Sequence, residues 1–214
     1  ALTSGVTVNL FNGTASDGDI LSGIENDIGS NYADSFITRI DTNNVIDAGT
    51  GSEVNGDTID YSTNGATGLT LDLSSKTSGY ATATITGSTF VDSLKDIENV
   101  IGTAGKDIIT GTSEKNTISG NAGNDTISTG AESDRVDGGD GNDLIDGGIG
   151  GDILNGDAGD DTFNGIDFTG DIIDGGTNTT VGDTVDYSAV ASSGITVNLS
   201  IISNDNVTIG SNTH

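Results

Sequence analysis

The chain has 214 residues and a formal net charge of -27, with 33 acidic residues against six basic ones. This excess of negative charge excludes nucleic acid and an anionic membrane surface as partners, since both bind clustered Lys and Arg, and it favours a cation as the counterpart. Cys is absent, which excludes disulfides and thiolate metal sites, and no apolar run approaches the about 18 residues that a membrane span needs.

Residues 1–101 are predicted to form a degenerate β-solenoid or cap unit. TSGVTVNLF (3–11), TGLTLDLS (67–74) and TATITGST (82–89) have strand-like patterns. We predict that they are edge or capping strands, because the ends of a stacked fold expose unpaired backbone groups. The strand-like pattern already present at the first residues leads us to expect that the chain is an excerpt of a longer one.

Residues 102–174 repeat with a period of nine. Seven nonapeptides follow one another without a gap from Gly102 to Asn164, and an eighth (165–174) has one extra residue. An apolar residue follows two places after an acid or Asn in every copy. The sixth positions are Asp107, Asn116, Asp125, Asp134, Asp143, Asp152, Asp161 and Asp171, and the eighth positions are Ile109, Ile118, Ile127, Val136, Ile145, Leu154, Phe163 and Ile173.

Residues 175–214 are predicted to begin a further repeat unit and to form a β cap. GDTVDYS (182–188) copies GDTIDYS (56–62), and SGITVNLS (193–200) resembles TGLTLDLS. The chain therefore consists of a short unit, a longer unit with inserted nonapeptides, and the start of a third unit.

The nonapeptide predicts an all-β fold, a parallel β-roll with 18 residues per coil and flanking β-strand caps. The last three residues form a short strand whose central apolar side chain points inward, and the Gly-rich first six form a turn. Two nonapeptides make one coil. Apolar residues at the seventh position (Ile108, Leu144, Ile153 and Ile172) should point outward, either as strand formers or as contacts to a neighbouring module or subunit.

Such a coil buries few apolar groups against the entropy of ordering a Gly-rich backbone. Acids eighteen residues apart would also stack and repel one another. A hard cation with oxygen ligands offsets both costs, and Ca²⁺ fits better than Mg²⁺, which demands tight octahedral geometry. The two rows of sixth-position residues would be Asp107, Asp125, Asp143 and Asp161 on one edge, and Asn116, Asp134, Asp152 and Asp171 on the other.

GGDGNDLID (138–146) and GGIGGDILN (147–155) resemble the RTX (repeats-in-toxin) nonapeptide G-G-x-G-x-D-x-U-x at every specified position. The resemblance implies a β-roll that is disordered in the cytosol and folds outside the cell after type I secretion. It also implies about four to six Ca²⁺ ions, held by sixth-position Asp side chains and by the carbonyls of first and third turn residues. The implied ligands are Asp107, Gly120, Ala122, Asp125, Asp134, Gly138, Asp140, Asp143, Gly147, Ile149, Asp152, Gly156, Ala158, Asp161 and Asp171.

Among the departures from this pattern, three bear on the fourth and sixth positions. Glu114 and Glu132 replace the fourth-position Gly, where a positive φ is expected, and Asn116 replaces a sixth-position Asp. We expect the site between Asn116 and Asp134 to be weak or absent. Asp34, in the degenerate copy GSNYADSFI (29–37), remains an open candidate.

An enzyme is not expected. A single His excludes an HExxH metalloprotease, few aromatic residues speak against a sugar cleft, and the basic residues do not cluster. An ice-binding ladder of second-position Thr103, Thr112 and Asn121 stops at Gly130. We predict an extracellular, calcium-dependent structural module of a large secreted bacterial surface adhesin. A self-assembling S-layer or sheath subunit is the alternative, and neighbouring modules or other subunits are the expected partners.

Overall fold

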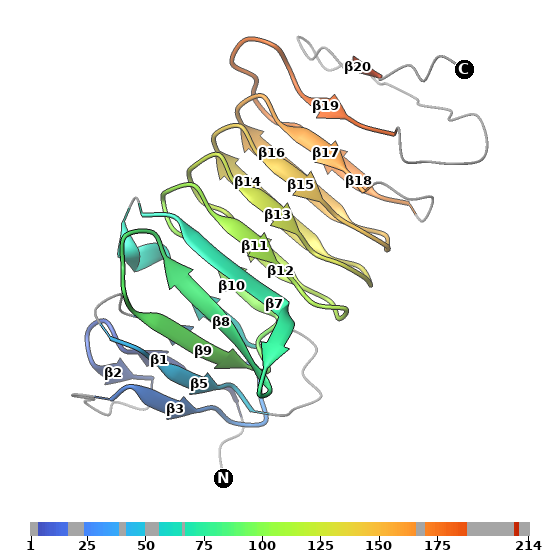
Figure 1. Ribbon diagram of the computed structural model, residues 1–214. Helices are drawn as coiled ribbons and strands as arrows, with labels where there is room; N and C mark the ends of the chain where they lie inside the picture. Colours follow the sequence, from blue (N-terminus) through green and yellow to red (C-terminus); the bar gives the residue numbers. More distant parts are fainter. Residues whose placement is uncertain are drawn as a thin grey trace.

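The computed structural model describes residues 4–16, 24–38, 42–49, 56–65, 67–165, 170–187 and 208–209, and within these ranges the strands form two facing sheets of a solenoid (Figure 1). Sheet 1 contains, in spatial order, β2 (Thr14–Ala15), β1 (Thr7–Asn9), β4 (Ser35–Ile37), β6 (Thr58–Asp60), β10 (Asn99–Ile101), β12 (Thr117–Ser119), β14 (Arg135–Asp140), β16 (Ile153–Ala158) and β18 (Ile172–Asp174). Sheet 2 contains β3 (Asn26–Ile28), β5 (Val45–Asp47), β9 (Val91–Lys95), β8 (Tyr80–Ile85), β7 (Leu69–Thr77), β11 (Ile108–Thr110), β13 (Thr126–Ser128), β15 (Leu144–Asp146), β17 (Thr162–Asn164), β19 (Thr184–Val185) and β20 (Thr208–Ile209). A short 3-10 helix, η1 (Ser62–Asn64), follows β6.

Successive nonapeptides alternate between the two sheets. On sheet 1, Ile118 pairs with Val136 in parallel, and Val136 pairs with Leu154. On sheet 2, Ile127 pairs with Ile145 in the same way. Each step is eighteen residues, so two nonapeptides make one coil and the predicted parallel β-roll is confirmed.

The core of the roll lies between the two sheets, and each nonapeptide strand contributes one inward side chain to it. The eighth-position residues from Ile109 to Phe163 are all buried, and Ile173 is partly buried against them. The seventh-position residues Ile108, Leu144, Ile153 and Ile172 are exposed, as expected. The alternation of neighbouring side chains across a strand explains both results.

Sheet 2 contains an antiparallel meander that sheet 1 lacks. β7 pairs in parallel with β11, β8 is antiparallel to both β7 and β9, and β9 pairs in parallel with β5. Because the meander has three strands, its last strand runs in the same direction as its first, and the parallel stack can continue. The β7–β8 turn places Ser78 (φ 57) and Gly79 (φ 90) at its two central positions, as a type I′ hairpin turn requires.

The meander corrects the prediction that TGLTLDLS and TATITGST are edge or capping strands. β7 and β8 lie inside sheet 2, with hydrogen-bonded neighbours on both sides. Strand-like composition does not distinguish an end strand from an inserted hairpin. The first copy, in β1, does lie next to the end of sheet 1, while SGITVNLS (193–200) lies outside the described residues.

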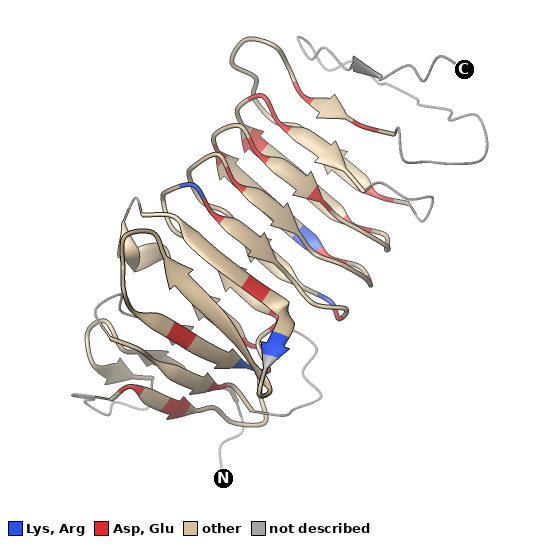
Figure 2. Cartoon of the chain, in the orientation of Figure 1, with Lys and Arg blue, Asp and Glu red and all other residues tan. Residues whose placement is uncertain are grey.

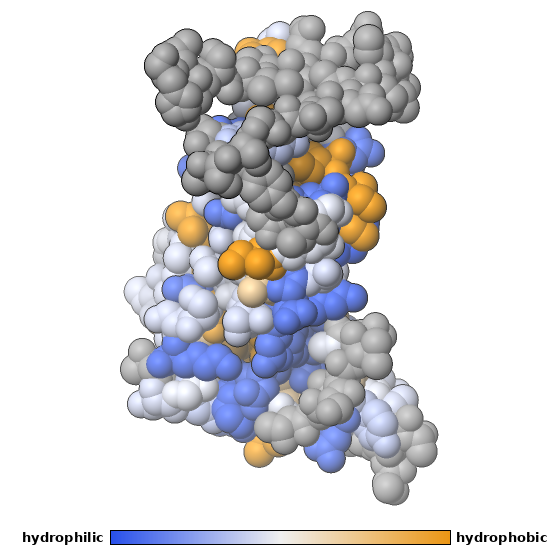
Figure 3. Space-filling view, turned by 90° about the vertical axis from the view of Figure 1, so that its right-hand side faces the viewer, coloured by the Kyte–Doolittle hydropathy of each residue, from blue (hydrophilic) through white to orange (hydrophobic). Residues whose placement is uncertain are grey.

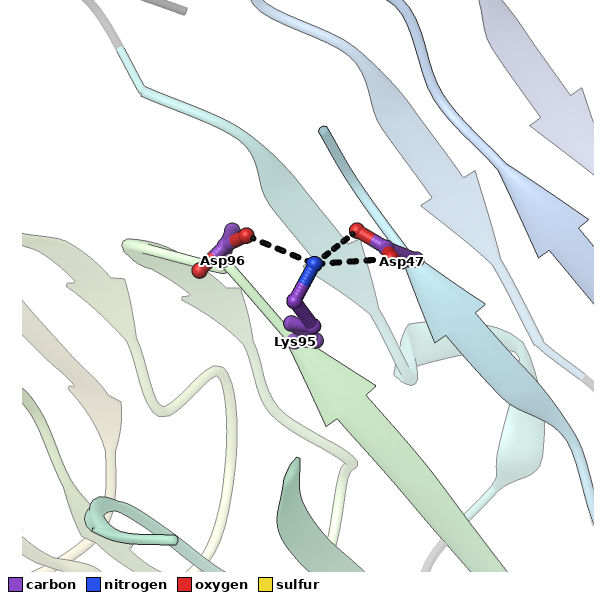
Figure 4. A network of polar contacts seen from close by, with 3 residues as sticks. All are labelled: Asp47, Lys95 and Asp96. Atoms are coloured by element: carbon purple, nitrogen blue, oxygen red, sulfur yellow. Dashed lines mark hydrogen bonds and ion pairs between the residues drawn. The ribbon is translucent and has the colours of Figure 1, made fainter. Parts of the chain in front are cut away.

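A charged contact joins the N-terminal coils to the meander (Figure 4). Lys95 of β9 lies opposite Asp47 of β5. Its Nζ atom donates to both Asp47 carboxylate oxygens (2.9 and 2.8 Å) and lies 3.2 Å from Asp96 Oδ2. These side chains are partly exposed, so the pair aligns the strands more than it stabilises them.

The two copies of the GDT(I/V)DYS motif lie on different sheets. GDTIDYS contributes β6 to sheet 1, whereas the described part of GDTVDYS contributes β19 to sheet 2. Tyr61 of the first copy is buried, and Tyr187 of the second packs against the core. The roll between them therefore ends half a coil out of step with its beginning.

Candidate calcium sites

The sixth-position side chains form a hydrogen-bonded ladder along each edge of the roll. On the first edge, the backbone N–H groups of Asp107, Asp125 and Asp143 donate to Oδ1 of the sixth-position Asp one coil further on, over 2.7, 2.8 and 2.8 Å. On the second edge, the N–H groups of Asn116, Asp134 and Asp152 donate in the same way to Asp134, Asp152 and Asp171, over 2.7, 2.9 and 3.0 Å. The two predicted rows are therefore formed by residues eighteen or nineteen apart.

The second carboxylate oxygen is left without a partner at several rungs. Oδ2 of Asp125, Asp134, Asp143 and Asp161 is buried and makes no hydrogen bond. An unpaired buried charge is costly, and each of these oxygens needs a proton or a cation.

First-position glycines provide the space beside Oδ2 of Asp125, Asp143 and Asp161. A Cβ atom on Gly120 would collide with Asp125 Oδ2 and would lie 2.6 Å from the carbonyl oxygen of Gly138. Gly138 has the same surroundings, with Asp143 Oδ2 and the carbonyl oxygen of Gly156. Each of these two cradles therefore places a carboxylate oxygen near a carbonyl oxygen of the next coil, where a Cβ atom does not fit; in the turn of Asp134 the first residue is Thr129.

The electrostatics agree with this geometry. Burial raises the pKa of Asp125 to about 7 and the pKa values of Asp143 and Asp161 to about 6. Burial also raises the pKa values of Asp107 and Asp134. The protein leaves one oxygen of Asp125, Asp134, Asp143 and Asp161 without a partner, and a bound cation would compensate these carboxylates.

The third-position carbonyl oxygens have backbone partners. Those of Asp140 and Ala158 accept the N–H groups of Gly123 and Gly141 (2.7 and 2.6 Å). Ala122 and Ile149 form isolated parallel bridges with the corresponding residues of adjacent coils. Among the first-position residues, the Gly147 carbonyl accepts the hydroxyl of Thr129 (2.8 Å). Each carbonyl oxygen has two lone pairs, so one acceptor site remains available on these groups.

The donor set suits a hard cation. The described residues contain no cluster of three or more His, Cys, Asp or Glu side chains that could hold a metal ion, so carboxylates alone do not make a site. Carboxylate and carbonyl oxygens together are the ligands that Ca²⁺ uses. Figure 2 shows acidic residues recurring along the roll, with few Lys or Arg among them. Bound Ca²⁺ would neutralise the buried carboxylates and supply the missing partners.

The three departures from the repeat differ in their structure. Glu132 has the predicted positive φ of 75°, whereas Glu114 does not have a positive φ. At Asn116, Oδ1 accepts the N–H of Thr112 (2.8 Å) and Nδ2 donates to the carbonyl of Glu98 (2.6 Å). Asn116 is thus held within the protein, and the expectation of a weak site beside it stays a prediction.

The ladder extends beyond the nonapeptides, which the sequence analysis did not anticipate. The N–H groups of Val6, Asp34 and Asp57 donate to Asp34 Oδ1 (2.6 Å), Asp57 Oδ1 (2.7 Å) and Glu98 Oε2 (2.9 Å). Asp161 N–H donates to Asp183 Oδ1 (2.9 Å). The available signal was an acid two places before an apolar residue, present at Asp34, Asp57, Asp92, Glu98 and Asp183 without the Gly-rich turn.

One of these extra rungs is closed within the protein, with both carboxylate oxygens partnered. Asp92 accepts the N–H and Nδ2 of Asn44 on one oxygen (2.9 and 2.8 Å) and the hydroxyl of Tyr61 on the other (3.0 Å). Burial is the main cause that raises the Asp92 pKa. Here a Tyr and an Asn supply the partners that other rungs lack.

Stacked parallel coils with buried, half-partnered carboxylates define a cation-binding β-roll. Residues 101–136 and 128–163 match the family of the RTX calcium-binding nonapeptide repeat (4 copies). Residues 101–163 therefore belong to the RTX repeat family, and the chain is a calcium-binding β-roll protein over this segment. The comparison with curated proteins gives no match for the chain.

Proposed function

We propose that the chain is an extracellular structural module that folds on binding Ca²⁺ and serves as a rigid extender of a large secreted bacterial adhesin. The observation that carries the proposal is the series of buried Asp side chains with one unpartnered oxygen, repeated along a continuous stack. Metal binding and folding are then one process, because the unfolded chain has no preformed site.

Location outside the cell is supported by the repeat family, whose members are typically secreted and extracellular. Extracellular Ca²⁺ would drive folding after export, and we propose type I secretion as the route. In the described parts of the chain, no helix is long and apolar enough to cross a membrane. We further propose that the module has no enzymatic activity, because its buried acids serve the ladder.

Removal of calcium tests the proposal. In Ca²⁺-free buffer, far-UV circular dichroism should report mostly disorder, and small-angle scattering should approach the radius of gyration of about 50 Å expected for an unfolded chain of this length. Millimolar Ca²⁺ should restore β-structure and a compact, elongated particle. Identical spectra and radii under both conditions would contradict the proposal.

A self-assembling S-layer or sheath subunit is the second candidate. Ile153 and Ile172 are exposed neighbours on the outer face of sheet 1, where a second subunit could pack. Figure 3 shows a mostly hydrophilic described surface on one side of the roll, with apolar residues in separate groups, which favours the extender. A monomer at high Ca²⁺ concentration supports the extender, and a lattice or polymer that dissolves on chelation supports the assembly subunit.

A further inference from the structure

The turns that present sixth-position residues are of two kinds. In the turn of residues 102–107, Thr103 closes the carboxylate of Asp107 from within the protein. The Thr103 N–H donates to Asp107 Oδ2 (2.7 Å) and the Thr103 hydroxyl donates to Asp107 Oδ1 (2.7 Å). Leu69 N–H also donates to Oδ1 (2.6 Å), so both oxygens of this buried carboxylate have partners.

Two other turns are closed by their second residue, although at Asn116 the Thr112 hydroxyl accepts a hydrogen bond from Nδ2 (3.2 Å) and does not donate. The N–H and hydroxyl of Ser30 both donate to Asp34, and Thr112 N–H donates to Asn116 Oδ1. In all three turns the second-position hydroxyl also accepts the N–H of the residue two places later, over 3.0 to 3.2 Å. The shared feature is a Ser or Thr at the second position, which is not among the residues with positive φ.

Four of the described turns are open, those of Asp125, Asp134, Asp143 and Asp161. Their second residues have positive φ, as at Asn121 (71°), Gly130 (120°), Gly139 (104°) and Asp157 (68°). These residues precede Asp125, Asp134, Asp143 and Asp161, whose Oδ2 atoms have no partner. In the turn of Gly148 (φ 78), the second-position N–H donates to Asp146 Oδ1 (3.0 Å), away from the sixth-position carboxylate.

Turn type also explains the two glutamates at the fourth position. Glu114 lies in a closed turn, where the fourth residue does not take a positive φ, and Gly105 behaves in the same way. Glu132 lies in an open turn, where the fourth residues Gly123, Gly141 and Gly159 have positive φ. Gly150, in the turn of Gly148, does not have a positive φ.

We infer that the second residue of each turn decides whether its coil edge requires calcium. Ser or Thr closes the carboxylate with its own N–H and hydroxyl, whereas Asn, Gly or Asp leaves one oxygen for the ion. The inference rests on the proposed calcium-dependent folding. It distinguishes turns that need calcium to fold from turns that do not. The turns closed by Thr103 and Thr112 lie on opposite edges of the roll and form a calcium-independent coil, on which the open turns from residue 120 onward are stacked.

The sequence offers a reciprocal pair of variants. Residues 102–107 read GTAGKD and residues 120–125 read GNAGND, and the two turns stack directly, with Asp107 N–H on Asp125 Oδ1. Asn121→Thr gives the second turn the closing hydroxyl of the first, and Thr103→Asn removes it from the first. The matched controls are Asn121→Val, which has the shape of Thr without its hydroxyl, and Thr103→Ser, which keeps the hydroxyl. Asn121→Thr and Asn121→Val both lose the bond from Asn121 Nδ2 to the Gly102 carbonyl (2.7 Å).

Both variants are made in the full chain. Calorimetry measures how many Ca²⁺ ions each binds, and mass spectrometry measures amide hydrogen exchange. We expect Asn121→Thr to bind fewer Ca²⁺ ions than wild type and to slow exchange of residues 120–128 in Ca²⁺-free buffer by about tenfold relative to Asn121→Val. Thr103→Asn should accelerate exchange of residues 102–110 in Ca²⁺-free buffer by a similar factor, and added Ca²⁺ should reverse the loss. Thr103→Ser should behave as wild type.

The inference is overturned if Asn121→Thr matches Asn121→Val in both stoichiometry and exchange. Should Thr103→Asn fail to fold, the comparison at position 121 still decides, because Asn121→Thr adds hydrogen bonds to a turn that wild type already forms. A wild-type chain that binds no Ca²⁺ contradicts the proposed function itself. Binding by wild type with no effect of the hydroxyl contradicts only the role of the second residue.

Discussion

At the scale of a single residue, the two carboxylate oxygens of Asp143 have different roles. Oδ1 accepts the N–H of Asp125 and fixes the stacking of adjacent coils, while Oδ2 is buried without a partner. Asn keeps an oxygen that can serve the first task, but it removes the charge that serves the second. A change to Asn therefore separates the structural role from the ion-binding role.

We expect Asp143→Asn to weaken Ca²⁺ binding by at least about tenfold at the affected sites, the loss of one charged ligand. Asp143→Ala should also disturb the adjacent site, because it removes the rung as well as the charge. Calorimetric titration with Ca²⁺ measures both effects. Asp140→Asn is the control, since the Asp140 side chain is exposed and only its carbonyl was implied as a ligand. Equal losses from Asp143→Asn and Asp140→Asn would refute this assignment.

The two fourth-position glutamates should respond oppositely to replacement by Gly. Glu132 has a φ of 75°, a conformation that costs a non-Gly residue about 1 kcal/mol. We expect Glu132→Gly to raise the free energy of unfolding in saturating Ca²⁺ by about 0.5–1 kcal/mol. Glu114→Gly should be neutral or destabilising, since Glu114 does not have a positive φ. Urea titration followed by circular dichroism compares the two, and a larger gain from Glu114→Gly would be contrary to this account.

At the scale of the strand, neighbouring residues of β15 face opposite environments. Ile145 is fully buried in the core between the sheets, and Leu144 is 38% exposed. We expect Ile145→Ala to cost about 2–5 kcal/mol through lost burial and a cavity, and Leu144→Ala to change stability by less than about 0.5 kcal/mol. Chemical unfolding in saturating Ca²⁺ measures both. A large cost at Leu144 would instead indicate that the outer face is covered by a partner.

The strands from β11 to β18 could be predicted from the sequence because each nonapeptide repeats the same pattern of a turn followed by a short strand. A fixed acid and a fixed apolar position determine the inward face, the coil length and both ladders. The β7–β8–β9 meander could not be predicted, because its placement inside sheet 2 depends on long-range pairing with β5 and β11. Hairpin composition alone leaves that pairing open.

The site was predictable in part for the same reason. The rows of Asp followed from spacing, since residues eighteen apart must stack in such a roll. The difference between Thr103 and Asn121 depends on backbone conformation and on which N–H reaches the carboxylate, and neither follows from the repeat pattern. The extra rungs at Asp57 and Asp183 were missed, and Asp34 was left as an open candidate, because the Gly-rich turn was treated as necessary for the ladder.

At the scale of the whole molecule, the buried carboxylates of the ladders make the stability of the calcium-free chain fall as pH rises. Bound Ca²⁺ reverses this dependence, because it requires the same carboxylates in their charged form. An unfolded Asp titrates near 3.9, whereas the folded pKa is about 7 at Asp125 and about 6 at Asp143 and Asp161. Between these values the folded chain binds more protons than the unfolded chain, so its stability without Ca²⁺ falls as pH rises. Protons and Ca²⁺ compete for the same oxygens.

We therefore expect more β-structure at pH 5 than at pH 8 in Ca²⁺-free buffer, and weaker Ca²⁺ binding as pH falls through the range 7 to 6. Circular dichroism and calcium titration at both pH values measure this. The triple variant Asp125→Asn, Asp143→Asn and Asp161→Asn should flatten the Ca²⁺-free dependence, although the other acids still titrate. Greater stability at pH 8 than at pH 5 without Ca²⁺ would contradict the assignment of these pKa values.

The placement of β6 and β19 on different sheets gives the roll a rotational phase. Each nonapeptide advances the chain by half a coil, so an even number of added copies returns the next unit to the same side and an odd number moves it to the opposite side. Slippage of one repeat during replication would lengthen the module slightly and also turn every later unit about its long axis. The number of nonapeptides therefore determines the length of the module, and whether that number is even or odd determines the side to which the following units point.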